Sequence, residues 1–138
     1  MSEEEVRRTV VRYWWRMAQD SLQSAHREMA AGFLHFAINR AYYALFYAAS
    51  AALLERHREF KKHAGVRAAF HRELIKPGQL PREYGELYDR LFRSRQYGDY
   101  VAVATFEPGY VEEEIGKVES FLRAIHPLIT LLREDASQ

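Results

Sequence analysis

The sequence predicts an all-α protein, an up-down four-helix bundle with one additional short helix. Three observations carry this prediction: apolar residues recur at helical spacing along most of the chain, the stretches between breaks are long, and only 7 Gly and 4 Pro are present among 138 residues. An all-β fold has many turns, and this number of glycines and prolines is too small for them. The length and the 48% content of hydrophobic residues suit one core, so we expect a single domain over residues 1–138.

The first predicted helix covers residues 3–31. Ser2 and the three glutamates after it have the form of a capping box, because the hydroxyl can accept a hydrogen bond from a free first-turn amide and acidic groups suit the positive helix end. Apolar residues then recur at three- to five-residue steps and keep a broad apolar stripe on one side. Gly32 offers a C-cap, so the helix is expected to end just before it.

The second predicted helix covers residues 33–57 and should be the central one. Little of its circumference is polar before residue 55, which is typical of a helix surrounded by others. Its many alanines favour the helical state and let a neighbouring helix approach closely.

A shorter helix is predicted over residues 66–75, where Lys76, Pro77 and Gly78 stop it. Pro81 fits the first turn of a fourth helix, because its missing N–H costs nothing there. The helical spacing of apolar residues then continues towards Val101.

The fourth helix is expected to end at the sequence Glu107-Pro108-Gly109. A last helix is predicted over residues 110–133 from its apolar spacing. Pro127 lies inside that pattern and predicts a kink, because proline cannot donate the helical hydrogen bond.

Composition limits the possible functions. Lys+Arg 20 against Asp+Glu 19 gives a formal net charge of +1, so any contact with nucleic acid must be local. The absence of cysteine excludes disulfides, thiolate metal sites and thiol catalysis. No apolar run long enough to span a membrane occurs, and the acidic start is unlike a signal peptide, so we expect a cytoplasmic protein that does not enter a membrane.

The familiar sequence signatures of enzymes are missing. There is no GxxxxGK[ST], GxGxxG, HExxH or GxSxG, and no histidine pair with the spacing of a bundle metal site. We therefore expect no metal and no cofactor. Five histidines are expected to lie singly on helical surfaces: His26, His35, His57, His71 and His126.

Three polar motifs interrupt the apolar pattern. The first, N-R-A-Y-Y-A-L-F from Asn39, puts a guanidinium into the most apolar helix, where it must find a partner or lie at an edge. The second, K-K-H-A-G-V from Lys61, is a basic turn at a helix start. The third, R-S-R-Q-Y-G-D-Y from Arg93, places Arg95 and Asp99 four residues apart on one helix face.

In this order the motifs N-R-A-Y-Y-A-x-F, K-K-H-x-G-V followed by Phe70, and R-x-x-x-D-Y resemble the HEPN family, from about Ala18 to Leu122. The resemblance implies a HEPN-like, mostly antiparallel bundle of five helices that dimerises. It also implies a gene that often lies beside one for a minimal nucleotidyltransferase, and a role in nucleotide binding or RNA cleavage.

The chain departs from the ribonuclease members, which carry a histidine four to six residues after the motif arginine. Here Asp99 and Tyr100 follow Arg95, and no histidine occurs between His71 and His126. Metal-free RNA cleavage needs a general base near pH 7 and cations on the phosphate, and Arg95 can supply only the cation. The unperturbed pKa values of Asp99 and Tyr100 are about 4 and about 10, far from pH 7, so both are weak candidates for the base.

Two of these groups have alternative roles. His63 could bind an anion or act in catalysis, and it could equally be hydrogen-bonded across the bundle. Arg95 could form a simple intrahelical ion pair with Asp99, or Asp99 could hold the guanidinium towards a phosphate. The candidate ligand-binding residues are Arg40, Lys62, His63 and Arg95, with Lys61 beside them.

The sequence thus favours a non-catalytic, homodimeric HEPN-type module that binds a nucleotide, an RNA phosphate or a partner nucleotidyltransferase, in a toxin-antitoxin-like pair. One alternative is a metal-independent ribonuclease toxin that uses Arg95 with a substitute base. The other is a purely structural subunit. We expect a homodimer because the chain has more apolar surface than one small bundle can readily bury.

Overall fold

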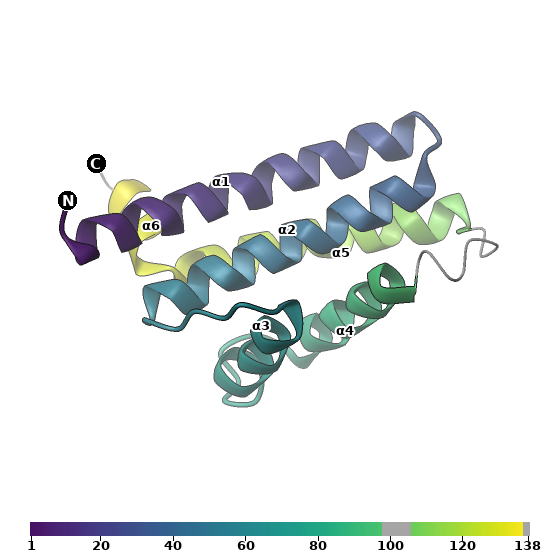
Figure 1. Cartoon of the computed structure of the whole chain (residues 1–138). Coiled ribbons are helices and arrows are strands. Elements are labelled where there is room, and N and C mark those ends of the chain that lie inside the picture. The colour runs from purple at the N-terminus through teal and green to yellow at the C-terminus, as the bar shows by residue number, and fades with distance from the viewer. Residues whose placement is uncertain (98–105, 137–138) are drawn as a thin grey trace.

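The computed structural model of the protein describes residues 1–97 and 106–136, and all regular structure within these ranges is helical. This confirms the predicted all-α bundle. Figure 1 shows α1, α2 and α5 side by side, with α3 and α4 along the other side of α2. The helices are α1 (Glu3–Ala30), α2 (Leu34–Glu55), α3 (His63–Phe70), α4 (Arg82–Tyr97), α5 (Pro108–Ile125) and α6 (Thr130–Ala136), with a π-helical turn at His71–Ile75 and a 3-10 turn at His126–Leu128.

The two ends of α1 follow the sequence signals. Ser2 is extended, and its Oγ accepts a hydrogen bond from the Glu5 amide at 3.1 Å. Gly32 has a φ of +86°, the left-handed region that glycine enters without a steric penalty. The chain therefore reverses within three residues between α1 and α2.

α2 is the central helix, as predicted, because it contacts α1, α3, α4 and α5. Ala41, Ala44 and Ala48 are fully buried on it, and so are the larger Tyr42 and Leu45. Small side chains let the neighbouring helices approach, and the large ones fill the space that remains.

α3 begins at His63, three residues before the predicted start at 66. Lys62 is extended and its carbonyl accepts from the Val66 amide at 3.3 Å, so helical bonding begins at this basic turn. The predicted helix over 66–75 is also not uniform, because the Lys76 amide bonds to the His71 carbonyl at 2.8 Å and closes a wider π turn. Gly85 makes room for it: a Cβ there would lie 2.8 Å from the His71 ring.

Both prolines near the C-terminus act differently from the prediction. Pro108 was predicted to lie in the stop of the fourth helix, but it occupies the first turn of α5, two residues before the predicted start at 110. Pro127 breaks the last helix instead of kinking it, since Ile129 is extended between the 3-10 turn and α6. The Glu55 carboxylate stabilises this break by accepting from the amides of Thr130 (2.9 Å) and Leu131 (2.7 Å).

Two further expectations concern the end of the fourth helix and the position of His57. The predicted extension of the fourth helix beyond Tyr97 lies outside the described residues. His57 is not on a helical surface, because it follows α2 in a turn with a φ of +64°.

Over the described part of the chain, no helix has both the length and the apolar content to cross a bilayer.

Candidate functional site

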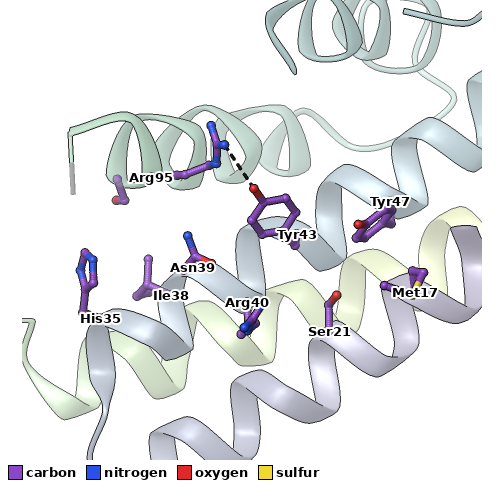
Figure 2. Close-up of a pocket in the computed structure, with 10 residues that line it drawn as sticks. Met17, Ser21, His35, Ile38, Asn39, Arg40, Tyr43, Tyr47 and Arg95 are labelled. Carbon is purple, nitrogen blue, oxygen red and sulfur yellow. Dashed lines mark hydrogen bonds between the residues drawn. The ribbon is translucent and has the colours of Figure 1, made fainter. Parts of the chain in front are cut away.

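A cavity of about 660 Å³ lies among α1, α2 and α4. Figure 2 shows its floor on α2, with Arg95 reaching in from α4 and Ser21 and Met17 from α1. Polar and aromatic groups dominate the ten described lining residues, which are Met17, Ser21, His35, Ile38, Asn39, Arg40, Tyr43, Tyr47, Ser94 and Arg95.

The charge in this cavity is of one sign. Two guanidinium groups, from Arg40 and Arg95, line it, and none of the ten described lining residues is acidic. Within the described ranges, neither arginine forms an ion pair. An anion entering the cavity would therefore meet two cations that the described protein groups leave unneutralised.

Arg95 is held in place by tyrosines of α2. Its Nη2 donates to the Tyr43 hydroxyl at 3.2 Å, the bond drawn in Figure 2. Its Cζ lies 5.4 Å from the ring centroid of Tyr42 and 5.5 Å from that of Tyr43, within the range of a cation–π contact. These contacts with tyrosines hold the guanidinium without neutralising its charge.

The buried Tyr42 side chain in turn contacts the half-buried His63. The Tyr42 hydroxyl and the Nδ1 of His63 are 2.8 Å apart, and the imidazole stacks on Phe46 with ring centroids 4.0 Å apart. Burial raises the pKa of Tyr42, while burial and the nearby Arg95 cation lower the pKa of His63. The phenol therefore stays protonated at neutral pH and shares one hydrogen bond with the imidazole.

The structure brings some of the predicted site residues together and separates others. Arg40 and Arg95 line one cavity, whereas His63 is not among the ten lining residues and stacks on the Tyr42 ring, over which Arg95 also lies. Lys62 is exposed at the start of α3 and is not among the ten lining residues, and neither is its neighbour Lys61. Asp99 and Tyr100, which were predicted as weak catalytic candidates, lie outside the described residues.

Besides the tyrosines, four polar lining residues are not among the predicted site residues: Ser21, His35, Asn39 and Ser94. A sequence signal existed for His35, which is one helical turn before Asn39 and therefore on the same face as the first motif. The sequence alone favours a plain surface role for it, because no second histidine lies at the spacing of a bundle metal site.

A second polar cluster lies between α3 and α4. Asp89 accepts from Arg67 at 2.8 Å and pairs with His71 at 2.9 Å. Burial alone would raise the pKa of Asp89, but the hydrogen bonds and the charges of Arg67 and His71 together outweigh it and lower the pKa. The described residues bring no three histidine or carboxylate side chains together that could hold a metal ion.

Comparisons with known proteins show the family of the chain. Residues 11–128 match the family model of the HEPN domain. A UPF0332 protein of Thermotoga maritima is 44% identical over 90% of this chain and 94% of its own length. A Methanocaldococcus jannaschii protein named "Putative toxin MJ0142" is 33% identical over 76% of this chain and 71% of its own, and "Putative toxin MJ0605" from the same organism is 32% identical over 61% and 63%. On this match, and on the helical bundle that carries its motifs, the chain belongs to the HEPN family.

Proposed function

We propose that this protein is a non-catalytic HEPN module that binds the phosphate of a nucleotide or an RNA in the cavity among α1, α2 and α4. The observation that carries the proposal is the pair Arg40 and Arg95, which line one cavity without a described acidic neighbour. A guanidinium presents a planar fork of donors that matches two phosphate oxygens, and this geometry makes arginine the favoured residue for such ligands.

The rest of the lining suits the remainder of a nucleotide. The volume of about 660 Å³ falls inside the range of about 300 to 1,000 Å³ that is common for small-ligand sites. Tyr43 and Tyr47 offer aromatic faces, and Asn39 and Ser94 offer hydrogen-bonding groups for a sugar or a base edge.

Removing either cavity arginine is expected to weaken phosphate binding about 10- to 150-fold, since a hydrogen bond to a charged group contributes about 1.5 to 3 kcal/mol. The measurement is the Kd of Arg40→Gln and Arg95→Gln for adenosine monophosphate and pyrophosphate, at several salt concentrations. Affinity should fall with salt in the wild type and less steeply in the variants. The matched control is Arg82→Gln, at the other end of α4, where the side chain is 90% exposed. An equal loss in this control would mean that only diffuse charge attracts the ligand.

A ribonuclease toxin is the second candidate, because His35 lines the same cavity as Arg95 and an imidazole can serve as a general base. We nevertheless expect no cleavage of single-stranded RNA under chelator, since the family's histidine position after Arg95 holds Asp99 and Tyr100. Cleavage that persists through purification and disappears in Arg95→Ala or His35→Asn would establish the ribonuclease instead. His63→Asn belongs in the same assay, because His63 is the other imidazole close to Arg95.

The remaining parts of the proposal concern assembly. We propose that the whole chain, residues 1–138, forms one module that acts in the cytoplasm as a homodimer. Exposed Val6 and Tyr13 on α1 support a self-interface, since they are seven residues apart and share a helix face. The relatives named as toxins support a toxin-antitoxin-like pairing, with a minimal nucleotidyltransferase as the proposed partner. A purely structural subunit is less well supported, because it would give the cavity arginines no role.

A further inference from the structure

A second cavity, of about 540 Å³, lies between α1 and α5, and we call it the α1–α5 groove. Four residues from each helix line it, and neither α3 nor α4 contributes to the described lining. Figure 1 shows α3 and α4 along the other side of α2. On α5 the lining extends from Glu119 to His126, which are seven residues apart. The groove therefore follows α5 for two helical turns, about 10 Å.

The groove is on the opposite side of α1 from the arginine cavity. Trp15 and Leu22 line the groove, whereas Met17 lines the cavity. Each residue of an α-helix is turned by about 100° from the one before it, so Val6 and Tyr13 lie on the same side as Met17. A homodimer formed through Val6 and Tyr13, as proposed above, would therefore leave the groove open.

The groove has an apolar floor between polar edges. Trp15 and Leu22 are half-buried, and Leu122 on α5 is only 6% exposed. Gln19 and Gln23 are exposed on the α1 side of the same groove. Two parallel edges with an apolar floor between them are the usual receptor for the apolar face of an amphipathic helix.

The two edges carry positive charge without a described acidic partner. Arg123 lines the α5 side, and Arg16 lies seven residues before Gln23 and so shares its side of α1. Within the described ranges neither arginine forms an ion pair. Glu119 is the one acidic group among the eight described lining residues, and its carboxylate already lies 2.6 Å from Nε2 of His26. An occupant with carboxylates along both edges would complement this charge.

We propose that the α1–α5 groove docks an acidic amphipathic helix of a partner protein. Leucine-like side chains of that helix, at positions i, i+4 and i+7, would cover Trp15 and Leu22, and its glutamates or aspartates would lie beside Arg16 and Arg123. Positions i and i+7 are about 10 Å apart along a helix, which matches the length of the groove. The inference does not depend on phosphate binding, because the groove and the arginine cavity share no described lining residue.

The test uses the full chain and two labelled synthetic peptides of about 15 residues, a length at which a helix can form. Both peptides carry leucines at i, i+4 and i+7. The positions that flank the leucines are glutamate in one peptide and lysine in the other. Fluorescence anisotropy is expected to show that the glutamate peptide binds at least about 10-fold more tightly, because only its charge complements the edges. The difference should shrink as salt is added.

Charge reversal at the edges is expected to reverse this preference. Arg16→Glu/Arg123→Glu should weaken binding of the glutamate peptide about 10-fold and strengthen binding of the lysine peptide. Both side chains are exposed, so the fold should be kept. The matched control Arg72→Glu/Arg82→Glu makes the same change in net charge at side chains that are 53% and 90% exposed, and should keep the preference. Trp15→Ala should weaken both peptides, with circular dichroism as the check on folding.

Several results would overturn the proposal. They are binding of neither peptide, equal binding of both, a preference that survives in Arg16→Glu/Arg123→Glu, and an equal loss in the Arg72→Glu/Arg82→Glu control. If Arg16→Glu/Arg123→Glu lowers self-association in sedimentation equilibrium, a second copy of the chain covers the groove instead. Arg95→Gln separates this inference from the proposed function, because it should weaken pyrophosphate binding and leave the glutamate peptide unaffected. A loss of both would mean that the peptide binds in the arginine cavity.

Discussion

Tyr42→Ala is expected to lower the free energy of unfolding by about 3 to 5 kcal/mol, the usual cost of truncating a fully buried aromatic residue. Tyr42 is 0% exposed at the centre of α2. Its ring contacts those of Phe46, Tyr88 and Phe92 with centroid distances of 6.1 to 6.3 Å, so the truncation opens a cavity where α2 packs against α4. Urea denaturation followed by circular dichroism measures the loss.

The matched variant Tyr42→Phe keeps the ring and removes only the hydroxyl that bonds to His63. We expect a loss of about 0.5 to 1.5 kcal/mol, as for one hydrogen bond. Pyrophosphate affinity should be kept, because the ring face next to Arg95 is still present. If Tyr42→Phe destabilises as much as Tyr42→Ala, the hydrogen bond and not the packing holds this region.

Arg90→Met is expected to cost about 3 to 5 kcal/mol, because it leaves a buried carboxylate without its main partner. Glu114 on α5 is 1% exposed, and Arg90 on α4 donates to both of its carboxylate oxygens, at 3.1 and 3.0 Å. The bond to Glu114 outweighs desolvation and raises the pKa of Arg90, which agrees with a strong pair. Lys117 lies 3.7 Å from the carboxylate and compensates only in part, since its own side chain is 47% exposed.

The double variant Arg90→Met/Glu114→Leu is the control for this prediction. Replacing both members of a buried ion pair by apolar residues of similar size is often neutral or stabilising, so most of the lost stability should return. Thermal unfolding of the single and double variants measures the difference. Equal destabilisation in both would mean that the aliphatic part of Arg90 matters more than the charge of Glu114.

The long helices could be predicted because their signals are local. The cap at Ser2, the turn at Gly32 and the apolar periodicity of α1 and α2 each act within a few residues, and the structure confirms all of them. The break at Pro127 could not be predicted as a break. The group that stabilises it, the Glu55 carboxylate, is 75 residues away from Thr130 in the sequence, and spacing does not reveal such a contact.

For the candidate site, the sequence could predict the two arginines but not that they line the same cavity. Arg40 stands out in the sequence because it is a charge within a largely apolar helix, and Arg95 because it lies four residues before Asp99 in the third motif. Their meeting in one cavity depends on how α4 crosses α2, a tertiary arrangement that brings Arg95 to a tyrosine 52 residues earlier. The turn at Lys61 and Lys62 looked equally basic, but the direction of α3 leaves both lysines exposed outside the lining.

The Glu55 carboxylate also sets an order of events during folding. α6 has seven residues, too few to form a stable helix in isolation. Its first two amides are held by the last residue of α2, so its first turn gains these bonds only once α2 has formed and the chain has returned across the bundle. A contact of this sequence separation requires a large loop to close, and such closures come late and slow the overall rate. The amides of Thr130 and Leu131 should therefore be among the last to gain protection from hydrogen exchange as the bundle assembles.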